Sequence, residues 1–218
     1  MKVLLIGGGG REHALGWKIA QSPLLSTLYT VSANPGLQAL GEPLALGGDA
    51  PDEIARVADD AGVDLVVVGP EAPLAAGLAD ALVDAQIPCF GPTAAAARLE
   101  TSKAFMKEIC AAAGAPTADY GRFDAAGPAR DHLRRSSPPY VVKADGLAAG
   151  KGVVVAETLQ EADAAVDAML GGAHGEAGRT IVIEEFLEGE EASFFAFCDG
   201  ERVVPLIGAQ DHKRAFDG

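Results

Sequence analysis

Apolar residues in the first hundred positions alternate between short continuous runs and segments with helical spacing. The continuous runs predict strands of a parallel sheet that is covered on both faces; they lie at residues 2–6, 26–33, 63–69 and 87–91. The segments between them predict amphipathic helices at residues 11–22, 50–62 and 72–86. The resulting order βαβαβαβ predicts a doubly wound parallel sheet.

The pattern changes after about residue 100. A helix is predicted over 101–114, with Ser102 or Thr101 as N-cap and Gly114 as its end. A second helix over 158–170 begins with the capping-box pair Thr158 and Glu161. Strands antiparallel to one another are predicted at residues 140–143, 152–156 and 180–187, with a hairpin at 191–207 that turns at Asp199-Gly200. The second half is therefore predicted as a mixed α+β unit, with a boundary near residues 91–101.

The segment KADGLAAGKGVVVAE, residues 143–157, is a glycine-rich loop between two predicted strands. A Walker A loop has four residues between its first glycine and the Gly-Lys pair, and it leads into a helix. Here three residues separate Gly146 from Gly150, and Gly152 follows Lys151. Glycines allow backbone N–H groups to approach an anion, and Lys143 and Lys151 add positive charge. The segment is either a strand-to-strand anion loop or a hairpin with solvated lysines.

The segment IGGGGREHAL, residues 6–15, follows a strand and begins a helix, which is the setting of a dinucleotide fingerprint. The fingerprint is incomplete, because its third glycine position falls on His13 and the second strand has no acidic residue at its end. A helix N-terminus still favours an anion, and Arg11 can bind a phosphate through two hydrogen bonds. The alternative is a tight turn that only lets the helix pack on the sheet.

Two further loops end strands at the same edge of the predicted sheet. They are ANPG, residues 33–36, and GPEAP, residues 69–73. Ligands of open α/β sheets bind beyond the carboxyl ends of the strands, so the three loops together predict a substrate crevice. In that crevice Glu71 could orient an amine or a hydroxyl group, although a solvated turn glutamate is the alternative.

An acidic segment begins within the strand predicted at 180–187 and continues beyond it. Its glutamates are Glu184, Glu185, Glu188, Glu190 and Glu191. Such a run is usually a solvated surface. Because this one lies between two apolar strands, its carboxylates and backbone groups are alternatively placed to bind an adenine amino group or ribose hydroxyls.

Composition excludes several classes of partner. The 218 residues are 49% hydrophobic and 22% charged with a net charge of −14, and RDHLRR at 130–135 is the densest basic cluster. This argues against a nucleic-acid partner, and no apolar stretch is long enough to span a bilayer. Three widely spaced cysteines, Cys89, Cys110 and Cys198, fit neither a disulfide framework nor a zinc site. We therefore expect reduced thiols in a cytoplasmic protein.

The four histidines show no metal-ligand spacing. His13 lies on the helix after the first glycine loop and His212 in the segment DHKR, so both are candidates for ligand contact. His132 and His174 are predicted to be surface residues.

Six stretches in order along the chain carry a resemblance to one family. They are GGGGREHAL, VGPEAPLAAGL, FGPTAAAARLETSKAFMK, VVKADGLAAGKGV, IEEFLEGEEASF and QDHKR. Together they resemble the phosphoribosylamine–glycine ligases, or glycinamide ribonucleotide synthetases, of the ATP-grasp superfamily. The resemblance covers essentially the whole chain. It implies an α/β fold with a Rossmann-like pre-ATP-grasp domain at 1–100, an α+β ATP-grasp lobe with a linker helix at 101–191, and the start of a second, incomplete lobe at 192–218.

The resemblance implies ATP-dependent ligation of glycine to 5-phosphoribosylamine in purine biosynthesis. ATP phosphorylates the glycine carboxylate, the amine attacks the acyl phosphate, and glycinamide ribonucleotide, ADP and phosphate leave. As in other phosphoryl transfers, the protein mainly positions the reactants and neutralises charge. The implied cofactors are ATP and Mg²⁺. The implied partners are these small molecules, with neither nucleic acid nor membrane.

The resemblance also assigns residues to two sides of a site. Lys103 and Lys143 match lysines that contact ATP phosphates, residues 146–152 match a mobile loop that folds over them, and Glu191 matches a ribose-binding glutamate. The ATP side comprises Lys103, Lys143, Gly146, Gly150, Lys151, Gly152, Glu184, Glu185, Phe186, Leu187 and Glu191. The phosphoribosylamine side comprises Gly8, Gly9, Gly10, Arg11, Glu12, His13, Asn34, Pro35, Gly36, Gly69, Pro70, Glu71, Asp211, His212, Lys213 and Arg214.

Chains of this family are considerably longer than the present one. The resemblance therefore implies that the magnesium-binding Glu and Asn lie beyond Gly218, so that this chain holds no metal ligand. We expect the chain alone not to complete the ligase reaction. Glycine-dependent release of ADP by the purified chain would contradict that expectation.

Three alternatives remain open at the level of sequence. The first is another ATP-grasp carboxylate–amine ligase, against which the stretches REHAL and DHKR weigh. The second is a nucleotide-binding module without catalytic activity. The third is an NAD-dependent oxidoreductase, which the incomplete fingerprint disfavours.

Overall fold

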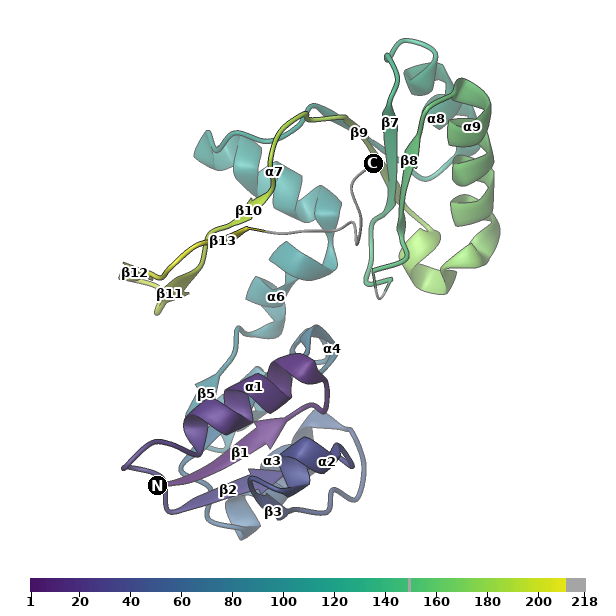
Figure 1. The fold of residues 1–218 in the computed structure, drawn as a ribbon. Helices are drawn as coiled ribbons and strands as arrows, with labels where there is room; N and C mark the ends of the chain where they lie inside the picture. The colour runs from purple at the N-terminus through teal and green to yellow at the C-terminus, as the bar shows by residue number, and fades with distance from the viewer. Residues whose placement is uncertain (149, 211–218) are drawn as a thin grey trace.

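A computed structural model describes residues 1–148 and 150–210 as two α/β regions joined by two consecutive helices (Figure 1). The first region is built on a five-stranded sheet of order β3-β2-β1-β4-β5, in which every pairing is parallel. Its strands are β1 (Lys2–Ile6), β2 (Thr27–Thr30), β3 (Glu42–Pro43), β4 (Leu65–Val68) and β5 (Cys89–Phe90). Its helices are α1 (Gly10–Ile19), α2 (Pro35–Gln38), α3 (Pro51–Asp60), α4 (Glu71–Ala75) and α5 (Leu78–Asp84).

The two faces of this sheet bury separate apolar clusters, because successive strand residues point to opposite sides. On one face Leu4 and Ile6 of β1 pack in a cluster with residues of α3, α4 and α5. On the other face Val3 and Leu5 pack in a cluster with Leu37 of α2 and residues of α1. The doubly wound parallel sheet predicted from the apolar runs is confirmed.

One predicted helix of this region is wrong in its extent. The single helix expected over 72–86 is two helices, α4 and α5, separated at Ala76 and Gly77. Gly77 has φ +96°, a left-handed conformation that interrupts helical geometry. The apolar spacing runs across this break because both helices pack on the same side of the sheet.

Two helices join the regions: α6 (Ala94–Thr101) and α7 (Lys103–Ala113). Ser102 is the N-cap of α7, and its hydroxyl accepts a hydrogen bond from Phe105 N at 3.1 Å. Gly114 ends α7 with φ +64°. Both ends of this helix are as predicted, whereas α6 was not predicted.

The second region contains a four-stranded antiparallel sheet of order β6-β9-β7-β8. Its strands are β6 (Tyr120–Phe123), β7 (Tyr140–Ala144), β8 (Val153–Ala156) and β9 (Ile181–Glu185). The helices α8 (Ala126–Leu133) and α9 (Leu159–Ala168) pack against the sheet in one apolar cluster, and Figure 1 shows both on the same side of it. Between α9 and β9 lie a π-helical turn, η1 (Met169–Ala173), and a 3₁₀ turn, η2 (Gly175–Gly178). The capping box of Thr158 and Glu161 at the start of α9 is confirmed.

The remaining described residues form two short antiparallel pairs. Strand β11 (Ala196–Cys198) pairs with β12 (Val203–Pro205), and β10 (Ala192–Ser193) pairs with β13 (Ala209–Gln210). The predicted Asp199-Gly200 turn is confirmed, since Asp199 accepts hydrogen bonds from Glu201 N and Arg202 N while Gly200 has φ +95°. Within residues 1–148 and 150–210, no helix combines the length and the hydropathy that crossing a membrane requires.

Cys89 and Cys198 are expected to differ in reactivity. Burial raises the pKa of the Cys89 thiol to about 11, whereas Cys198 is exposed on β11. At pH 8 only about one Cys89 thiol in a thousand is then the reactive thiolate. Iodoacetamide should therefore alkylate Cys198 well before Cys89, as peptide mass spectrometry over time would show. Equal rates in the native protein would contradict this, and equal rates in urea are the expected control.

Candidate functional site

The first part of the site lies where the chain order of the parallel sheet reverses. Strand β1 pairs with β2 on one side and with β4 on the other, so the loops after β1 and β4 leave the sheet side by side. Such a switch point is where open α/β sheets bind ligands. The loop after β1 carries Gly8 and Gly9 and leads into α1 at Gly10, and the loop after β4 carries Gly69 and Pro70, the N-cap of α4.

Arg11 connects these two loops. Its Nη1 donates to the carbonyl of Gly69 at 3.1 Å and to Glu71 Oε1 at 2.7 Å. The hydrogen bond from Arg11 holds the pKa of Glu71 below its usual value, and Glu71 in turn raises the pKa of Arg11. The pair therefore stabilises the fold at neutral pH, and this contribution is lost as the pH falls through the lowered pKa of Glu71. Both side chains are substantially exposed, which leaves them accessible to a ligand.

Asn34 connects the loop after β2 to the loop after β1. Its Nδ2 donates to Gly8 O at 3.0 Å, while its Oδ1 accepts from Gly36 N at 2.9 Å and caps α2, whose first residue is Pro35. The ring of His13 lies so close to Gly36 that a side chain there would collide with it. The three predicted strand-end loops thus form one continuous surface.

Glu12 has a different setting from its neighbours. It is only 5% exposed, and its Oε2 accepts a hydrogen bond from Gly9 N at 2.6 Å. Its carboxylate also lies against Gly7 and Gly69, where a Cβ would have no room. In this structure Glu12 therefore stabilises the glycine loops from within.

The second part of the site begins where the end of β7 meets the start of α7. Asp145 accepts hydrogen bonds from Ser102 Oγ at 3.0 Å and from Ala104 N at 2.7 Å. Lys103 Nζ donates to the carbonyls of Ala144 at 2.8 Å and Gly146 at 3.3 Å. Burial lowers the pKa of Lys103, and the nearby Asp145 carboxylate opposes that effect. These contacts fix Lys103 at the base of the glycine-rich loop.

The glycine-rich loop connects two antiparallel strands, as the sequence predicted. Strands β7 and β8 pair from Tyr140↔Ala156 to Lys143↔Val153. At the base of the loop, Gly146 N donates to Ala177 O at 3.1 Å and Ala144 N donates to Gly152 O at 2.8 Å. No helix begins in the described part of the loop, so the Walker A geometry is absent there.

Gly146 is expected to be required for the position of this loop. A Cβ on Gly146 would lie 2.7 Å from Ala177 Cα and 2.8 Å from its Cβ, so backbone would have to move. We expect Gly146→Ala to lower the free energy of unfolding by about 1–3 kcal/mol, because the added methyl group forces a backbone shift, as urea denaturation would show. Gly171→Ala is the matched control, because a Cβ there meets no atom within 4 Å. Equal free energies of unfolding for the two variants would contradict the prediction.

Glu184 lies between two lysines beside the loop. Its Oε2 is 2.6 Å from Lys143 Nζ, and its Oε1 is 3.5 Å from Lys107 Nζ. The side chain of Glu184 is 7% exposed and that of Lys107 is 2% exposed. Lys107 Nζ also donates to Thr117 Oγ1 at 2.8 Å and to Ala118 O at 3.0 Å. These contacts compensate for the burial of the charges on Glu184 and Lys107.

Lys107 was not predicted from the sequence. It occupies one of the buried positions of α7 together with Ala104, whereas Ile109 on the same helix is exposed. The one available signal was its spacing of four residues from Lys103, which places both lysines on one helix face. The residue that pairs with it, Glu184, is distant in sequence, so the spacing alone did not indicate the contact.

A cavity of about 580 Å³ brings the two parts of the site together. Arg11 and Glu71 line it from the first region, and Lys103, Lys143 and the glycine-rich loop line it from the second. The loop residues among its lining are Gly146, Leu147, Ala148, Gly150 and Gly152. The exposed Lys151 is not among them.

A second cavity of about 540 Å³ shares Lys143 and Glu184 with the first. Its apolar wall is formed by Val141, Val153 and Val155. Its other wall is the end of β9 and the acidic segment that follows it, with the residues Glu185, Phe186, Leu187, Glu188, Gly189, Glu190 and Glu191. An apolar wall opposite backbone and carboxylate groups suits a flat heteroaromatic ring.

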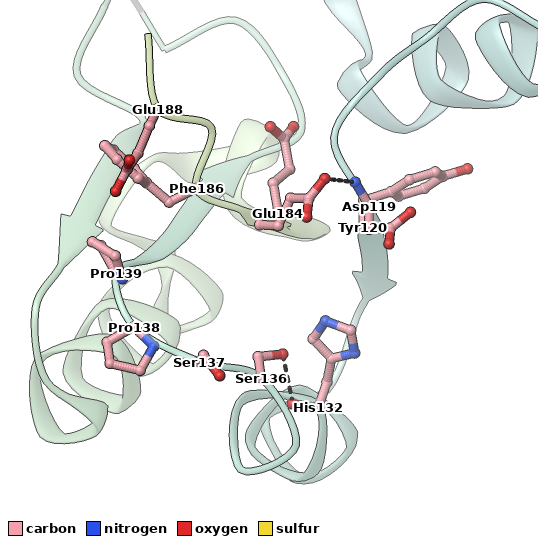
Figure 2. Close-up of a pocket in the computed structure, with 11 residues that line it drawn as sticks. Asp119, Tyr120, His132, Ser136, Ser137, Pro138, Pro139, Glu184, Phe186 and Glu188 are labelled. Atoms are coloured by element: carbon pink, nitrogen blue, oxygen red, sulfur yellow. Dashed lines mark hydrogen bonds between the residues drawn. The ribbon is translucent and has the colours of Figure 1, made fainter.

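A third cavity, of about 620 Å³, adjoins the acidic segment and is drawn in Figure 2. Asp119 and Tyr120 line it beside His132 of α8, opposite Phe186 and Glu188. His132 was predicted to be a surface residue; it is half-buried, lines this cavity, and its ring centre lies 5.2 Å from the centre of the Phe123 ring. Burial, followed by the charge of Arg135, lowers the pKa of His132, so the neutral imidazole dominates at pH 7.

Some predicted site residues are outside this geometry. Asp211, His212, Lys213 and Arg214 lie outside the described residues.

Among residues 1–148 and 150–210, no three His, Cys, Asp or Glu side chains are grouped in a way that could hold a metal ion.

Comparison with known proteins identifies the family. Residues 1–100 match the family description "Phosphoribosylglycinamide synthetase, N domain", and residues 101–218 match "Phosphoribosylglycinamide synthetase, ATP-grasp (A) domain". The chain belongs to the phosphoribosylglycinamide synthetase family. The resemblance predicted from six sequence stretches is thereby confirmed.

Individual relatives agree with this family. The chain is 58% identical over 218 residues to a phosphoribosylamine–glycine ligase of Brucella melitensis, covering 100% of this chain and 51% of the relative. It is 56% identical over 218 residues to that of Rhizobium meliloti, covering 100% of this chain and 52% of the relative. The chain thus spans about half the length of these curated relatives.

Solved structures show the same fold. A phosphoribosylamine–glycine ligase from Thermotoga maritima superimposes with a TM-score of 0.83 at 30% identity, covering 100% of this chain and 52% of that one. An N5-carboxyaminoimidazole ribonucleotide synthetase from Thermus thermophilus gives a TM-score of 0.70 at 22% identity, covering 99% of this chain and 55% of that one. The second likeness concerns the fold alone.

Proposed function

We propose that this chain contributes the ATP and phosphoribosylamine sites of a phosphoribosylamine–glycine ligase. In this proposal, residues 1–100 form the substrate domain, 101–191 an ATP-grasp lobe, and 192–218 the start of a second lobe. The reaction joins glycine to 5-phosphoribosylamine through a glycyl phosphate, and it releases ADP and phosphate. The free thiols Cys89, Cys110 and Cys198 suit a cytoplasmic enzyme.

The observation that carries the proposal is the cavity shared by the two regions. It places Arg11 and Glu71 on one side and Lys103, Lys143 and the glycine-rich loop on the other. A ligase that forms an acyl phosphate needs its amine acceptor next to the transferred phosphoryl group, because the intermediate must be attacked before water reaches it. The shared cavity supplies that proximity.

The ATP side combines positive charge with a glycine-rich backbone. Lys143 is placed to donate to a phosphate oxygen, and the backbone N–H groups of residues 146–148 and 150–152 can approach the other oxygens. Adenine fits the neighbouring cavity between the valine wall and Phe186 and Leu187, with Glu191 near the ribose. A strand-to-strand loop of this kind can open for nucleotide and close to exclude water.

The acceptor side is positioned by loop-to-loop hydrogen bonds. Arg11 is placed to bind the 5-phosphate, and the hydrogen bond from Asn34 to Gly8 O holds the first glycine loop at the N-terminus of α1. Glu71 is placed to accept a hydrogen bond from the amine or a ribose hydroxyl.

Calorimetric titration tests the proposal on the chain as it is. ATP with Mg²⁺ and, separately, ribose 5-phosphate are titrated, with NADH as the control ligand. We expect ATP to bind, ribose 5-phosphate binding to weaken in Arg11→Ala, and NADH to give no heat. Binding of NADH in place of ATP would overturn the proposal. Equal affinity of wild type and Arg11→Ala for ribose 5-phosphate would also overturn it.

A further inference from the structure

Lys107 is a buried cation that the proposed binding chemistry does not use directly. Its side chain is 2% exposed and contacts no cavity assigned to ATP. A lysine is rarely buried this completely unless its charge is paired. Its partners are Thr117 Oγ1, Ala118 O and, at 3.5 Å, Glu184 Oε1, and its Nζ lies 5.4 Å from the centre of the Tyr120 ring.

The same carboxylate also holds Lys143. Glu184 presents Oε2 to Lys143 Nζ at 2.6 Å and Oε1 to Lys107 Nζ at 3.5 Å. The three residues come from α7, β7 and β9, so the fold brings them together from three separate elements. Lys143 is 25% exposed and lines both cavities assigned to ATP, whereas Lys107 lies behind Glu184.

Lys107 changes the net charge of the cluster that it forms with Glu184 and Lys143. Lys143 and Glu184 alone would sum to zero, and an almost buried carboxylate would face an incoming phosphate. With Lys107 the three charges sum to one positive charge. Coulomb interactions at these separations are strong in the interior, so the second cation changes the potential that a phosphate meets.

We propose that Lys107 is a positioning residue for nucleotide binding, which neutralises Glu184 from behind and so leaves Lys143 available to an ATP phosphate. This inference rests on the proposed function, since it needs ATP phosphates at Lys143. Glu184 then acts as a support that orients Lys143 without cancelling its charge. Lys107 touches neither the nucleotide nor the reacting atoms.

The rival explanation is that Lys107 only anchors α7 to the segment before β6, through Thr117 and Ala118. The two explanations differ in what a second substitution does. If Lys107 acts through the charge of Glu184, then removal of that charge compensates for the loss of Lys107. If Lys107 is only an anchor, removal of the Glu184 charge cannot restore anything.

The test compares four proteins by calorimetric titration with ATP: wild type, Lys107→Met, Glu184→Gln and the double variant. Methionine keeps the length of the lysine side chain, and glutamine keeps the shape of the glutamate. We expect Lys107→Met to weaken ATP binding by about tenfold, which corresponds to about 1.4 kcal/mol. The double variant, with one net positive charge as in wild type, should recover most of that affinity. Lys18→Met, on an exposed position of α1, is the control for loss of one positive charge.

Urea unfolding of the same four proteins without nucleotide gives an independent measure of the coupling. If Lys107 and Glu184 interact as proposed, the unfolding midpoints change non-additively across the cycle. Additive changes would overturn the inference, and so would a double variant that binds ATP no better than Lys107→Met. Absence of ATP binding by folded wild type would overturn the proposed function and the inference with it. Normal ATP binding by Lys107→Met would overturn the inference alone.

Discussion

Replacing Glu184 with alanine is expected to lower the free energy of unfolding of this chain by about 3–5 kcal/mol, the usual cost of breaking a buried ion pair from one side. The substitution removes the carboxylate that faces two ammonium groups. Lys143 can turn toward solvent, but Lys107, at 2% side-chain exposure, cannot. It would remain buried with neutral partners only, Thr117 Oγ1 and Ala118 O. Urea denaturation followed by far-UV circular dichroism measures the loss.

The control for this prediction is Glu190→Ala, six residues further along the same acidic segment. Glu190 is exposed, so we expect its replacement to change the free energy of unfolding by no more than about 0.5 kcal/mol. A loss at Glu184 as small as that at Glu190 would show that water reaches Lys107 when the carboxylate is removed. The buried ion pair would then contribute little to stability.

Replacing Lys143 with alanine is expected to weaken ATP binding by about 10- to 100-fold. One charge-assisted hydrogen bond to a phosphate is worth about 1.5–3 kcal/mol, and about 1.4 kcal/mol corresponds to a factor of ten. Lys143 lines both cavities assigned to the nucleotide, and Glu184 fixes the direction of its ammonium group. Calorimetric titration of ATP into wild type and variant gives the ratio of affinities directly.

Loss of ATP binding in this variant has to be separated from loss of the fold. Lys143→Ala also removes a partner of Glu184, so circular dichroism must first show that the variant is folded. Lys18→Ala serves as the control for charge, because Lys18 lies on an exposed position of α1. If Lys143→Ala and Lys18→Ala bind ATP equally well, the phosphates do not lie at Lys143.

The sequence predicted those elements whose apolar residues follow a single period. Strands β1 and β4 are continuous apolar runs, and the capped ends of α7 and α9 have specific signals in Ser102, Gly114, Thr158 and Glu161. Helices α4 and α5 were merged because Gly77 interrupts the backbone without interrupting the apolar pattern. Whether a glycine inside a helical pattern ends the helix depends on packing, which the sequence does not display.

The segment between α7 and β7 shows most clearly which secondary structure could not be predicted from the sequence. Strand β6 and helix α8 were not predicted, because the segment around them combines prolines, glycines and charged residues with few apolar positions. Strand β6, with the sequence YGRF, is at the edge of its sheet, and its residues are only partly buried. A strand of this kind is specified by its neighbour more than by its own residues.

The candidate site also has features that the sequence predicted and features that it did not. Both cavities assigned to ATP contain residues that were predicted from glycine spacing, lysines and the acidic segment, such as Lys103, Lys143 and Glu184, but their apolar lining, such as Val141 and Val155, was not predicted. The packing of Glu12 against the glycine loops and the burial of Lys107 were not visible, because each depends on contacts between elements. The strand-end loops do meet in space, since the sheet topology predicted from the apolar runs requires it.

The order of strands in the second sheet has a consequence for synthesis of the chain on the ribosome. Strand β9 lies between β6 and β7, yet it is the last of the four strands in the sequence. The hairpin of β7 and β8 can pair as soon as it emerges, because its contacts are local. In the described part of the chain, β6 pairs only with β9. Strand β6 therefore remains unpaired while about sixty further residues are synthesised. The nascent chain therefore exposes the open edge of that hairpin, and the uncompensated charge of Lys107, until Glu184 arrives.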